Sequence, residues 1–593
     1  MKQLMTGDEA IARGAYEAGV RHASAYPGTP STEILENLAT YDEIYAEWAP
    51  NEKVAMESGI GAAIAGARSM VSMKHVGVNV AADPLFTWAY MGVNAGNVLV
   101  SADDPGMFSS QNEQDNRNYA KSAKLAMFEP SDSQECIDMV KAAYELSESY
   151  DTPVMIRMTT RVCHSKSIVE TGERVEVPLK AWEKNPAKYV CLPAISRKLR
   201  VKLQARMEKL EEYSETSPFN RVEMGDTSVG IIASGICYYY AKEVFGDQAS
   251  YLKLGFTNPM PKNLIKDFCD QMDKVYILEE NDPYIEEFVE RLGVKCEFHG
   301  KDLFPYTLEM TPDVIRKAVY GEALKTIEFD KEKLINRAPT FCAGCPHRGL
   351  FYRLGKRKDI MVSGDIGCYT LAANKPYSAL NSTICMGASL SVAHGAQKAF
   401  NQGDSGKRVV GVLGDSTFFH TGINSLMNTV YNNSNTVNII LDNRITGMTG
   451  HQDNPGTGFT AKGEPTAMLK IEDIVKAIGI KHVKVVNPNN LQEVDDALDE
   501  CLALDEPSVI ITRWPCVLKK FSEADKSEFD NLFKTKNRVD EEKCVGCKAC
   551  LKAGCPAMSY DKAAKKVRIN QASCVGCDVC TQVCPKDAIE KVN

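Results

Sequence analysis

The sequence lacks the features that mark several common classes of protein. Its 593 residues carry 69 Lys and Arg against 78 Asp and Glu, a net charge of −9, with no long basic run. A nucleic-acid partner is therefore not expected. No basic and apolar leader opens the chain, because Asp8, Glu9 and Arg13 interrupt its first stretch. Because of this, we expect a cytoplasmic protein. There is also no tandem short repeat and no low-complexity tract, so ordinary globular domains are expected.

The longest uncharged run near the start, 84–102, has about the length of a membrane span. It contains Pro84, Gly92, Asn94 and Asn97, which are unfavourable in such a span. A buried helix followed by a buried strand is the better prediction, and no membrane partner is expected.

Short runs rich in Val and Ile alternate with helical patterns along most of the chain. Helices are predicted at 10–18 and 136–147, and Thr6 with Glu9 forms a capping box before the first of them. Continuous apolar strands separated by helices indicate parallel sheets that are covered on both faces, and so an α/β fold. The predicted strands are 70–75, 98–102, 154–158, 229–233, 275–279, 409–413, 437–441 and 509–512.

The length suggests roughly four domains at about 150 residues each. A highly charged stretch at 196–222 is typical of a surface helix that links two domains. We expect α/β domains at 1–195, 220–330 and 335–520, followed by a small tail domain at 536–593.

Eight of the 20 cysteines lie between Cys544 and Cys584. In a reducing compartment such a cluster indicates metal ligation rather than disulfides. Two blocks of C-x2-C-x2-C spacing, each with a fourth Cys followed by Pro, resemble a two-cluster ferredoxin. The first block has one extra residue before its fourth cysteine, and a pair of zinc sites is the alternative. The resemblance implies two [4Fe–4S] clusters, with ligands Cys544, Cys547, Cys550 and Cys584 for one and Cys574, Cys577, Cys580 and Cys555 for the other.

A Gly-Asp-Ser sequence, Gly414 to Ser416, directly follows the apolar run at 409–413, and Asp442-Asn443 ends the next one 28 positions later. Glycine lets a backbone approach a diphosphate closely, and carboxylate and amide oxygens suit Mg²⁺. A turn that only ends a strand is the alternative. The pair resembles the thiamine diphosphate motif, which implies that Gly414, Asp415, Ser416, Asp442 and Asn443 border the cofactor. It also implies that Asp415, the Asn443 side chain and the Ile445 backbone oxygen bind Mg²⁺.

Thiamine enzymes also need a carboxylate against the aminopyrimidine ring. Glu57 is expected just before a helix rich in small residues, where a buried acid must have a partner. Upstream, Thr29 lies in a Tyr-Pro-Gly-Thr-Pro loop at 26–30. Together the two segments resemble the pyruvate-type 2-oxoacid:ferredoxin oxidoreductases. The resemblance implies that Glu57 bonds the aminopyrimidine and Thr29 contacts the 2-oxoacid, although a plain Pro-bounded turn would also explain Thr29.

The resemblance spans nearly the whole chain and is greatest for the large alpha subunits of indolepyruvate:ferredoxin oxidoreductases. It implies thiamine pyrimidine-binding and diphosphate-binding domains, a small α/β domain between them and a ferredoxin-like tail. The implied reaction is oxidative decarboxylation of arylpyruvates with coenzyme A, giving arylacetyl-CoA and CO₂, with electrons passing to an external ferredoxin. No part of the chain would supply the family's gamma domain, which implies a separate small beta subunit and an alpha2beta2 assembly. The alternatives are the same reaction on pyruvate or 2-oxoglutarate, and a non-catalytic electron-transfer subunit.

Two histidines and four further cysteines are candidates for additional roles. His75 and His420 each follow a predicted strand and could act in proton transfer or substrate binding, or be hydrogen-bonded core residues. Related oxidoreductases place a third cluster on matching positions, which predicts a third [4Fe–4S] cluster or, alternatively, structural thiols. Its ligands would be Cys342, Cys345, Cys368 and Cys516.

Overall fold

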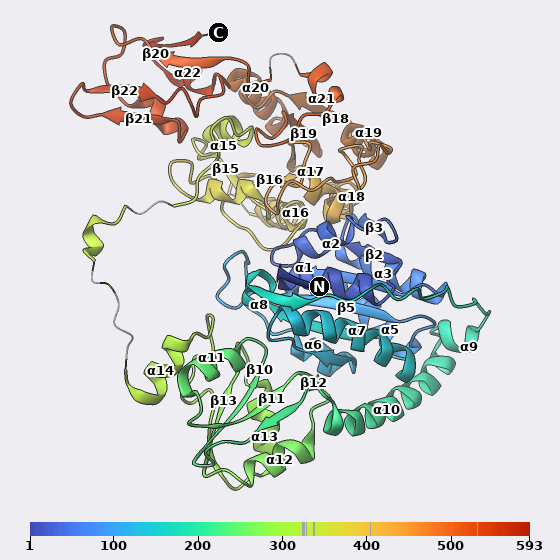
Figure 1. The fold of residues 1–593 in the computed structure, drawn as a ribbon. Coiled ribbons are helices and arrows are strands. Elements are labelled where there is room, and N and C mark those ends of the chain that lie inside the picture. The colour runs from blue at the N-terminus through green and yellow to red at the C-terminus, as the bar shows by residue number, and fades with distance from the viewer. Residues whose placement is uncertain (323–326, 328, 336–337, 404, 530–531, 593) are drawn as a thin grey trace. The chain divides into compact units, whose positions relative to one another are not determined.

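The computed structural model describes residues 1–322, 327, 329–335, 338–403, 405–529 and 532–592. The chain divides into two compact units, Met1–Phe329 and Asp330–Asn593 (Figure 1). The predicted boundary between the second and third domains, 330–335, adjoins residues outside the described ranges. Each unit is described by itself.

The larger sheet of the first unit has seven strands in the order β12-β6-β7-β5-β4-β2-β3. All neighbouring strands are parallel except the antiparallel pair β12–β6. The strands are β2 (His22–Ala25), β3 (Tyr45–Trp48), β4 (Ser69–Lys74), β5 (Asn97–Asp103), β6 (Ala126–Phe128), β7 (Val154–Thr159) and β12 (Phe256–Asn258).

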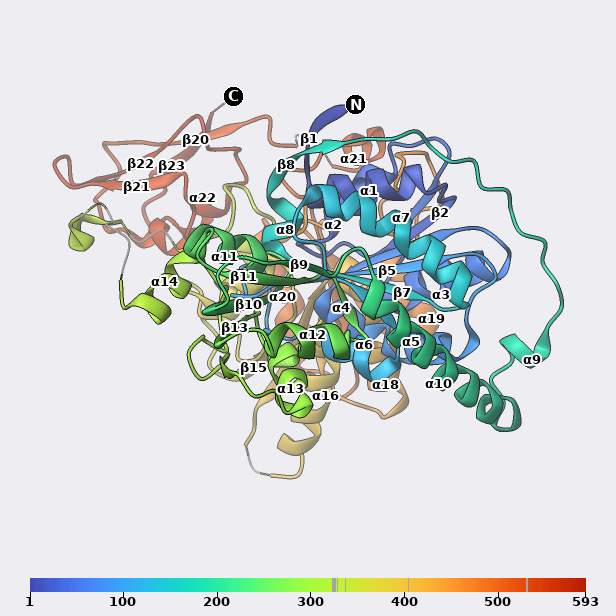
Figure 2. The same cartoon turned by 60° about the horizontal axis from the view of Figure 1, so that its bottom comes forward.

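Helices cover both faces of this sheet (Figures 1 and 2). On β5, Val98 and Val100 pack with α1 (Gly7–Glu17), α2 (Thr32–Leu38) and α7 (Ser133–Tyr150), whereas Leu99 packs with α3 (Glu52–Ile64) and α5 (Ala82–Met91). Because side chains alternate along a strand, a strand with apolar residues at successive positions is buried on both faces. The shorter elements are β1 (Lys2–Thr6), α4 (His75–Val80), α6 (Arg117–Ala123), α8 (Thr160–His164), β8 (Lys166–Glu170) and α9 (Pro186–Tyr189).

The second sheet of this unit follows the charged helix α10 (Pro193–Thr216) and has the order β14-β13-β10-β11-β9. Only the pair β11–β9 is antiparallel. Its strands are β9 (Arg221–Glu223), β10 (Val229–Ser234), β11 (Ser250–Leu254), β13 (Lys274–Leu278) and β14 (Glu297–His299). Its helices are α11 (Cys237–Phe245), α12 (Lys262–Cys269), α13 (Tyr284–Leu292) and α14 (Pro312–Tyr320).

The second unit contains a fully parallel five-stranded sheet in the order β15-β16-β17-β19-β18. Its strands are β15 (Ile360–Ser363), β16 (Arg408–Gly414), β17 (Val437–Asp442), β18 (His482–Val486) and β19 (Ser508–Arg513). Its helices are α15 (His347–Leu354), α16 (Ala388–Phe400), α17 (Asp415–Thr417), α18 (Ile423–Tyr431), α19 (Ile471–Ile478), α20 (Leu491–Leu502) and α21 (Glu523–Glu528).

The cysteine-rich tail has two small antiparallel pairs, β20–β23 and β21–β22. Their strands are β20 (Lys536–Val539), β21 (Met558–Asp561), β22 (Lys566–Ile569) and β23 (Ile589–Val592). Each cysteine block runs into a short helix, the 3-10 helix η4 (Ala549–Ala553) or α22 (Val579–Val583). The tail is therefore built as two similar halves.

The predicted α/β fold with parallel sheets is confirmed, and each predicted strand coincides with an observed one to within one residue at either end. The Thr6–Glu9 capping box is present, with Glu9 N donating to Thr6 Oγ1 at 3.1 Å and Thr6 N donating to Glu9 Oε2 at 2.7 Å. The run 84–102 forms most of α5 and β5, as predicted. None of the described helices is both long and apolar enough to cross a membrane.

The two sheets of the first unit are joined by buried charge. Arg117 at the start of α6 donates from Nη2 to Asp115 Oδ2 at 2.5 Å and from Nη1 to Glu279 Oε2, just after β13, at 2.7 Å. All three side chains are almost completely buried. Removing one partner of such a network leaves uncompensated charge in a low-dielectric interior.

Arg117→Met is therefore expected to lower the local free energy of opening around α6 and β13 by about 3–5 kcal/mol. Hydrogen exchange followed by mass spectrometry measures this as lost amide protection in peptides covering the two elements. The matched control is Lys121→Met, which removes an exposed ion pair to Glu287 and should change little. Unchanged protection in Arg117→Met would mean that the network does not hold the sheets together.

Candidate active site

The predicted Mg²⁺ ligands come together at the carboxyl edge of the parallel sheet in the second unit. Gly414 and Leu441 are paired in register on β16 and β17, so Asp415 and Asn443, which follow these strand ends, lie side by side. The end of the Asn443 amide lies 3.1 Å from Asp415 Oδ1 and 2.7 Å from the Ile445 carbonyl oxygen. This edge of an open α/β sheet is the usual position of a ligand site.

The donor set fits Mg²⁺. With metal–oxygen distances of 2.0–2.1 Å, neighbouring oxygens of an octahedral site are about 3 Å apart, close to the two separations found here. Asp415 is 2% exposed, and no described group donates a hydrogen bond to its Oδ2. Burial, followed by the charge of Asp442, raises the pKa of Asp415 to about 7. A cation facing this carboxylate would compensate for its burial.

The remaining residues of the motif shape the site rather than complete the set of oxygens. A Cβ at Gly414 would lie 3.0 Å from Cε1 of Tyr369, so the glycine allows this ring to pack over the turn. Ser416 accepts a hydrogen bond from Thr446 at 3.0 Å. Asp442 is ion-paired with Arg513 at 2.6 Å and Arg444 at 3.3 Å, so its carboxylate is already engaged by two arginines.

The four cysteines predicted for a third cluster gather beside these oxygens. Cys516 N donates to Asn443 O at 3.0 Å, and a Cβ at Gly447 would lie 3.7 Å from both Cys368 Sγ and Asn443 Nδ2. Burial raises the pKa of Cys345 to about 12 and that of Cys368 to about 11, and the charge of Cys516 adds to both shifts. Cys342 adds to the shifts of Cys368 and Cys516. The four thiols therefore form one group.

The eight tail cysteines line two separate cavities, divided as the ferredoxin resemblance implies. One cavity is lined by Cys544, Cys547, Cys550 and Cys584, and the other by Cys555, Cys574, Cys577 and Cys580. A tetrahedral zinc with bonds of 2.3 Å would hold its sulfurs about 3.8 Å apart. Among the described residues, no three cysteine sulfurs lie within 4.8 Å of one another.

The third cysteine group is packed against the tail. A Cβ at Gly344, inside the Cys342–Cys345 turn, would lie 2.1 Å from Val575, so only glycine permits this contact. Arg348 is 1% exposed and bridges the two parts: it donates to Cys342 O at 2.6 Å and to Ala553 O at 3.0 Å. Its positive charge lowers the pKa of both Cys345 and Cys577 against the larger effect of burial. A permanent cation thus lies between two groups of thiols.

The expected position of Glu57 at the start of a buried helix is wrong. Glu57 is the sixth residue of α3, its side chain is 46% exposed, and it forms an ion pair with Lys53 one turn earlier. The buried acid at the start of this helix is Glu52, which is 6% exposed. A Cβ at Gly77 would lie 2.8 Å from Glu52 Oε1, so the glycine makes room for this carboxyl group against α4.

Thr29 lies in the loop between β2 and α2, next to the end of β4. A Cβ at Gly28 would lie 3.0 Å from Lys74 Cβ, and Ser109 connects the two segments. Its Oγ donates to Thr29 O at 3.2 Å, and its carbonyl oxygen accepts from Lys74 Nζ at 2.6 Å. Lys74 is 8% exposed, and burial lowers its pKa to about 8. This lysine was not among the predicted site residues; its only signal in the sequence is a charged residue at the end of an apolar strand.

The two histidines are both buried. His75 begins α4, its Nε2 lies 3.2 Å from Asn112 Oδ1, and burial lowers its pKa, as in a neutral hydrogen-bonded core histidine. His420 lies in the π-helical segment Phe418–Gly422, five residues beyond Asp415, with Nδ1 3.2 Å from Thr421 Oγ1. Single π turns are frequent at functional sites.

Three known families match separate parts of the chain. Residues 13–216 match the family described as pyruvate flavodoxin/ferredoxin oxidoreductase, thiamine diP-bdg. Residues 365–512 match the thiamine pyrophosphate enzyme, C-terminal TPP binding domain, and residues 536–585 match the 4Fe-4S dicluster domain. The chain therefore has a thiamine-diphosphate-binding domain and a 4Fe–4S dicluster domain.

Several relatives match over almost the whole chain. The indolepyruvate oxidoreductase subunit IorA of Archaeoglobus fulgidus is 42% identical, over 99% of this chain and 97% of that protein. The proteins of the same name from Pyrococcus abyssi and Methanothermobacter marburgensis are each 41% identical, with the same coverage of both chains.

Proposed function

Because the chain belongs to the family of indolepyruvate oxidoreductase IorA subunits, we propose that it catalyses thiamine-diphosphate-dependent oxidative decarboxylation of arylpyruvates. The acyl group passes to coenzyme A and the electrons pass through iron–sulfur clusters to ferredoxin. The observation that carries this proposal is the convergence of the Asp415, Asn443 and Ile445 oxygens beside four cysteines in one unit. Oxidative decarboxylation of a 2-oxoacid needs a cofactor that stabilises the carbanion, and its oxidation in one-electron steps needs one-electron carriers nearby.

Asp415, Asn443 and the Ile445 carbonyl would hold Mg²⁺ and, through it, the diphosphate. When bound, thiamine diphosphate supplies the nucleophilic carbon and stabilises the negative charge left by loss of CO₂. These three oxygens need no further acids beside them, since Mg²⁺ usually keeps waters and phosphate oxygens as its other ligands.

Glu52 is better placed than Glu57 to bond the aminopyrimidine. A carboxylate that exchanges a proton with a ring nitrogen must be shielded from water and held in place. Glu52 meets both requirements against Gly77, whereas Glu57 is exposed and paired with Lys53. Glu52 also lies near the strand end that carries Lys74, because Gly77 follows Lys74 by three residues.

Lys74 and the Thr29 loop would bind the carboxylate of the 2-oxoacid. A buried ammonium group is a strong partner for an anion, because charge-assisted hydrogen bonds gain strength away from water. Lys74 already approaches Thr29 through Ser109. His75 and His420 would border the substrate or the cofactor and assist proton transfer.

The packing of the cysteine groups supports a third [4Fe–4S] cluster held by Cys342, Cys345, Cys368 and Cys516. This group adjoins Asn443 on one side and, through Gly344 and Val575, the tail cavity of Cys577 on the other. Electrons would then pass from the third cluster to the cluster held by the Cys577 set. From there they would pass to the cluster held by the Cys547 set, which faces the external ferredoxin. A small beta subunit with the gamma-type domain would complete an alpha2beta2 assembly.

A panel of 2-oxoacids tests the proposed reaction. The chain is purified anaerobically with its partner subunit and assayed for coenzyme A-dependent dye reduction with indolepyruvate, phenylpyruvate, pyruvate and 2-oxoglutarate. Higher kcat/KM for the two arylpyruvates supports the proposal. Preference for pyruvate or 2-oxoglutarate would reassign the substrate, and no turnover with bound thiamine diphosphate would favour the electron-transfer alternative.

The two glutamates make a matched pair. Glu52→Gln is expected to retain thiamine diphosphate and iron but to lose kcat by about 10²-fold or more, because a proton-transfer group is removed. Glu57→Gln should change kcat by less than about threefold, since an exposed i,i+4 ion pair contributes little. Steady-state kinetics and cofactor analysis of both variants decide between the two residues, and the reverse pattern would restore Glu57.

The pKa of Lys74 predicts a pH dependence for substrate capture. Above pH of about 8 the side chain loses its proton, so kcat/KM for the 2-oxoacid should fall as pH rises through this value. Lys74→Met should lower kcat/KM by about 10- to 100-fold below pH 8. In this variant kcat/KM should no longer fall as the pH rises through about 8. A pH dependence of kcat/KM that is caused by ionisation of the coenzyme A thiol would remain in both proteins. Lys209→Met on exposed α10 is the control, and an unchanged profile in Lys74→Met would contradict the assignment.

The third cluster changes the iron content. Three [4Fe–4S] clusters require about twelve iron atoms per chain, and the tail pair alone requires about eight. In a Cys345→Ser variant the count should fall toward eight while the tail clusters keep their EPR signals. A count near eight in the unaltered protein, with no change in the variant, would leave only the tail pair.

A further inference from the structure

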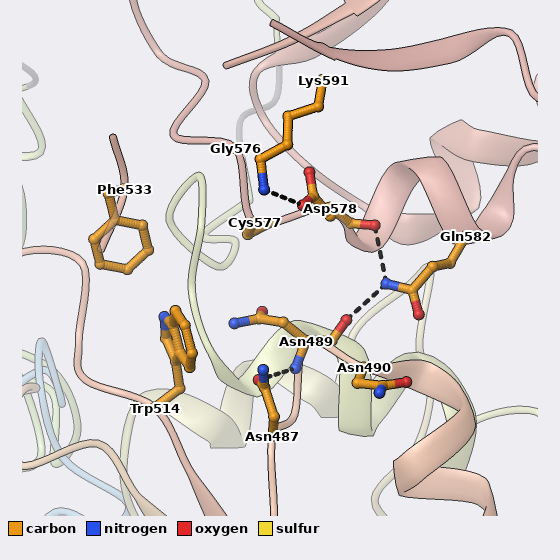
Figure 3. A pocket seen from close by; sticks show the side chains of 10 residues that line it. All are labelled: Asn487, Asn489, Asn490, Trp514, Phe533, Gly576, Cys577, Asp578, Gln582 and Lys591. Atoms are coloured by element: carbon orange, nitrogen blue, oxygen red, sulfur yellow. Dashed lines mark hydrogen bonds and ion pairs between the residues drawn. The ribbon is translucent and has the colours of Figure 1, made fainter. Parts of the chain in front are cut away.

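A cavity of about 470 Å³ lies in the second unit between the loop that follows β18 and the cysteine-rich tail. Figure 3 shows the loop asparagines on one side, Trp514 and Phe533 on another, and the Cys577 segment opposite the loop. The volume is within the usual range for small-molecule sites. Apart from Cys577, the residues that line this cavity have no part in the proposed reaction.

Three polar atoms in this cavity have no hydrogen-bond partner among the described residues. Asn489 is only 7% exposed, yet neither its Oδ1 nor its Nδ2 is bonded, and the same holds for Nε1 of Trp514. Buried polar atoms are almost always paired, because an unmade hydrogen bond costs free energy. The residues that line the cavity thus hold two buried donor atoms and one buried acceptor atom that no described residue satisfies.

The loop is built to hold the Asn489 side chain in this position. Its backbone nitrogen donates to Asn487 Oδ1 at 3.0 Å, and its backbone oxygen accepts from Gln582 Nε2 at 2.7 Å. Gln582 also accepts from Leu491 N at 2.8 Å, which ties the loop to α22. The main chain is therefore fixed on both sides while the amide group remains available (Figure 3).

The aromatic walls limit the shape of an occupant. The rings of Trp514 and Phe533 lie 6.5 Å apart between centroids at an interplanar angle of 83°, so they form two faces of a corner. Such surfaces favour a flat ring, which can stack on one face and meet the edge of the other. Lys591 and Asp578 also line the cavity; they form an ion pair at 2.8 Å, and the lysine is about half exposed.

We propose that this cavity binds a planar nitrogen heterocycle with hydrogen-bond donors and acceptors on its edge. The amide of Asn489 would pair with the ring edge, as an Asn amide pairs with adenine, and Trp514 would donate to a ring nitrogen or carbonyl. Adenine nucleotides and flavin mononucleotide share this chemistry. Because Cys577 lines the same cavity, the bound ring would lie next to the ligands of a tail cluster.

Anaerobic equilibrium dialysis of the full chain with its partner subunit tests the proposal, using AMP and FMN as separate probes. At least one probe should bind with a Kd below about 1 mM. Asn489→Leu should weaken binding by about tenfold or more, because two hydrogen bonds are lost from a similar volume. Asn432→Leu, an exposed asparagine outside the cavity, is the matched control.

The binding results for AMP and FMN distinguish a nucleotide site from a flavin site. Binding of FMN alone identifies a flavin site, binding of AMP alone identifies a nucleotide site, and competition between them identifies the shared ring chemistry. If Asn489→Leu loses iron, Trp514→Phe is measured in its place. This variant keeps an aromatic ring but lacks the indole donor, and it should still weaken binding severalfold. Failure of both probes to bind, or equal affinity in a variant that retains its iron, would overturn the proposal.

Discussion

The second unit depends on one buried guanidinium group. Arg348 is held by backbone oxygens of the Cys342 turn on one side and of the η4 segment on the other, and it also donates to Tyr377 at 2.7 Å. Its Nη1 and Nη2 atoms make four hydrogen bonds, whereas Nε has no partner among the described residues. These four bonds fix the contact between the diphosphate domain and the tail in one geometry. The same charge stabilises added negative charge on either cysteine group, since a nearby cation favours the reduced state of a cluster.

Parallel strand ends organise the rest of the chemistry in both units. In the second unit, β16 and β17 bring Asp415 and Asn443 together, and Cys516 follows β19, the next strand of the same sheet. In the first unit, β2 and β4 bring the Thr29 loop and Lys74 together. The carboxyl edges of parallel sheets concentrate loops that are positioned by a rigid scaffold, which explains how a long chain places a few polar groups accurately.

Much of this arrangement could be predicted from local patterns. The strands follow from short runs of Val and Ile, which are properties of neighbouring residues. The division of the tail cysteines follows from the resemblance of their two blocks to a two-cluster ferredoxin. The role of Glu57 could not be settled in this way. Glu52 and Glu57 are both acids near the start of α3, and only the packing of Gly77 against Glu52 separates a buried carboxylate from an exposed one. Lys74 and Arg348 were missed for the same reason, since their burial depends on segments far away in the sequence.

The central claim is that decarboxylation and electron exit are connected through the packed contact at Arg348. Rapid-freeze EPR after mixing the enzyme and its partner subunit with indolepyruvate and coenzyme A, without an acceptor, tests it most directly. The account predicts that tail clusters are reduced within one turnover in the unaltered enzyme. In Arg348→Met with equal iron and thiamine diphosphate, this reduction should be at least about tenfold slower, while the first release of CO₂ is unchanged. Equal rates of tail reduction in the two proteins would contradict the account.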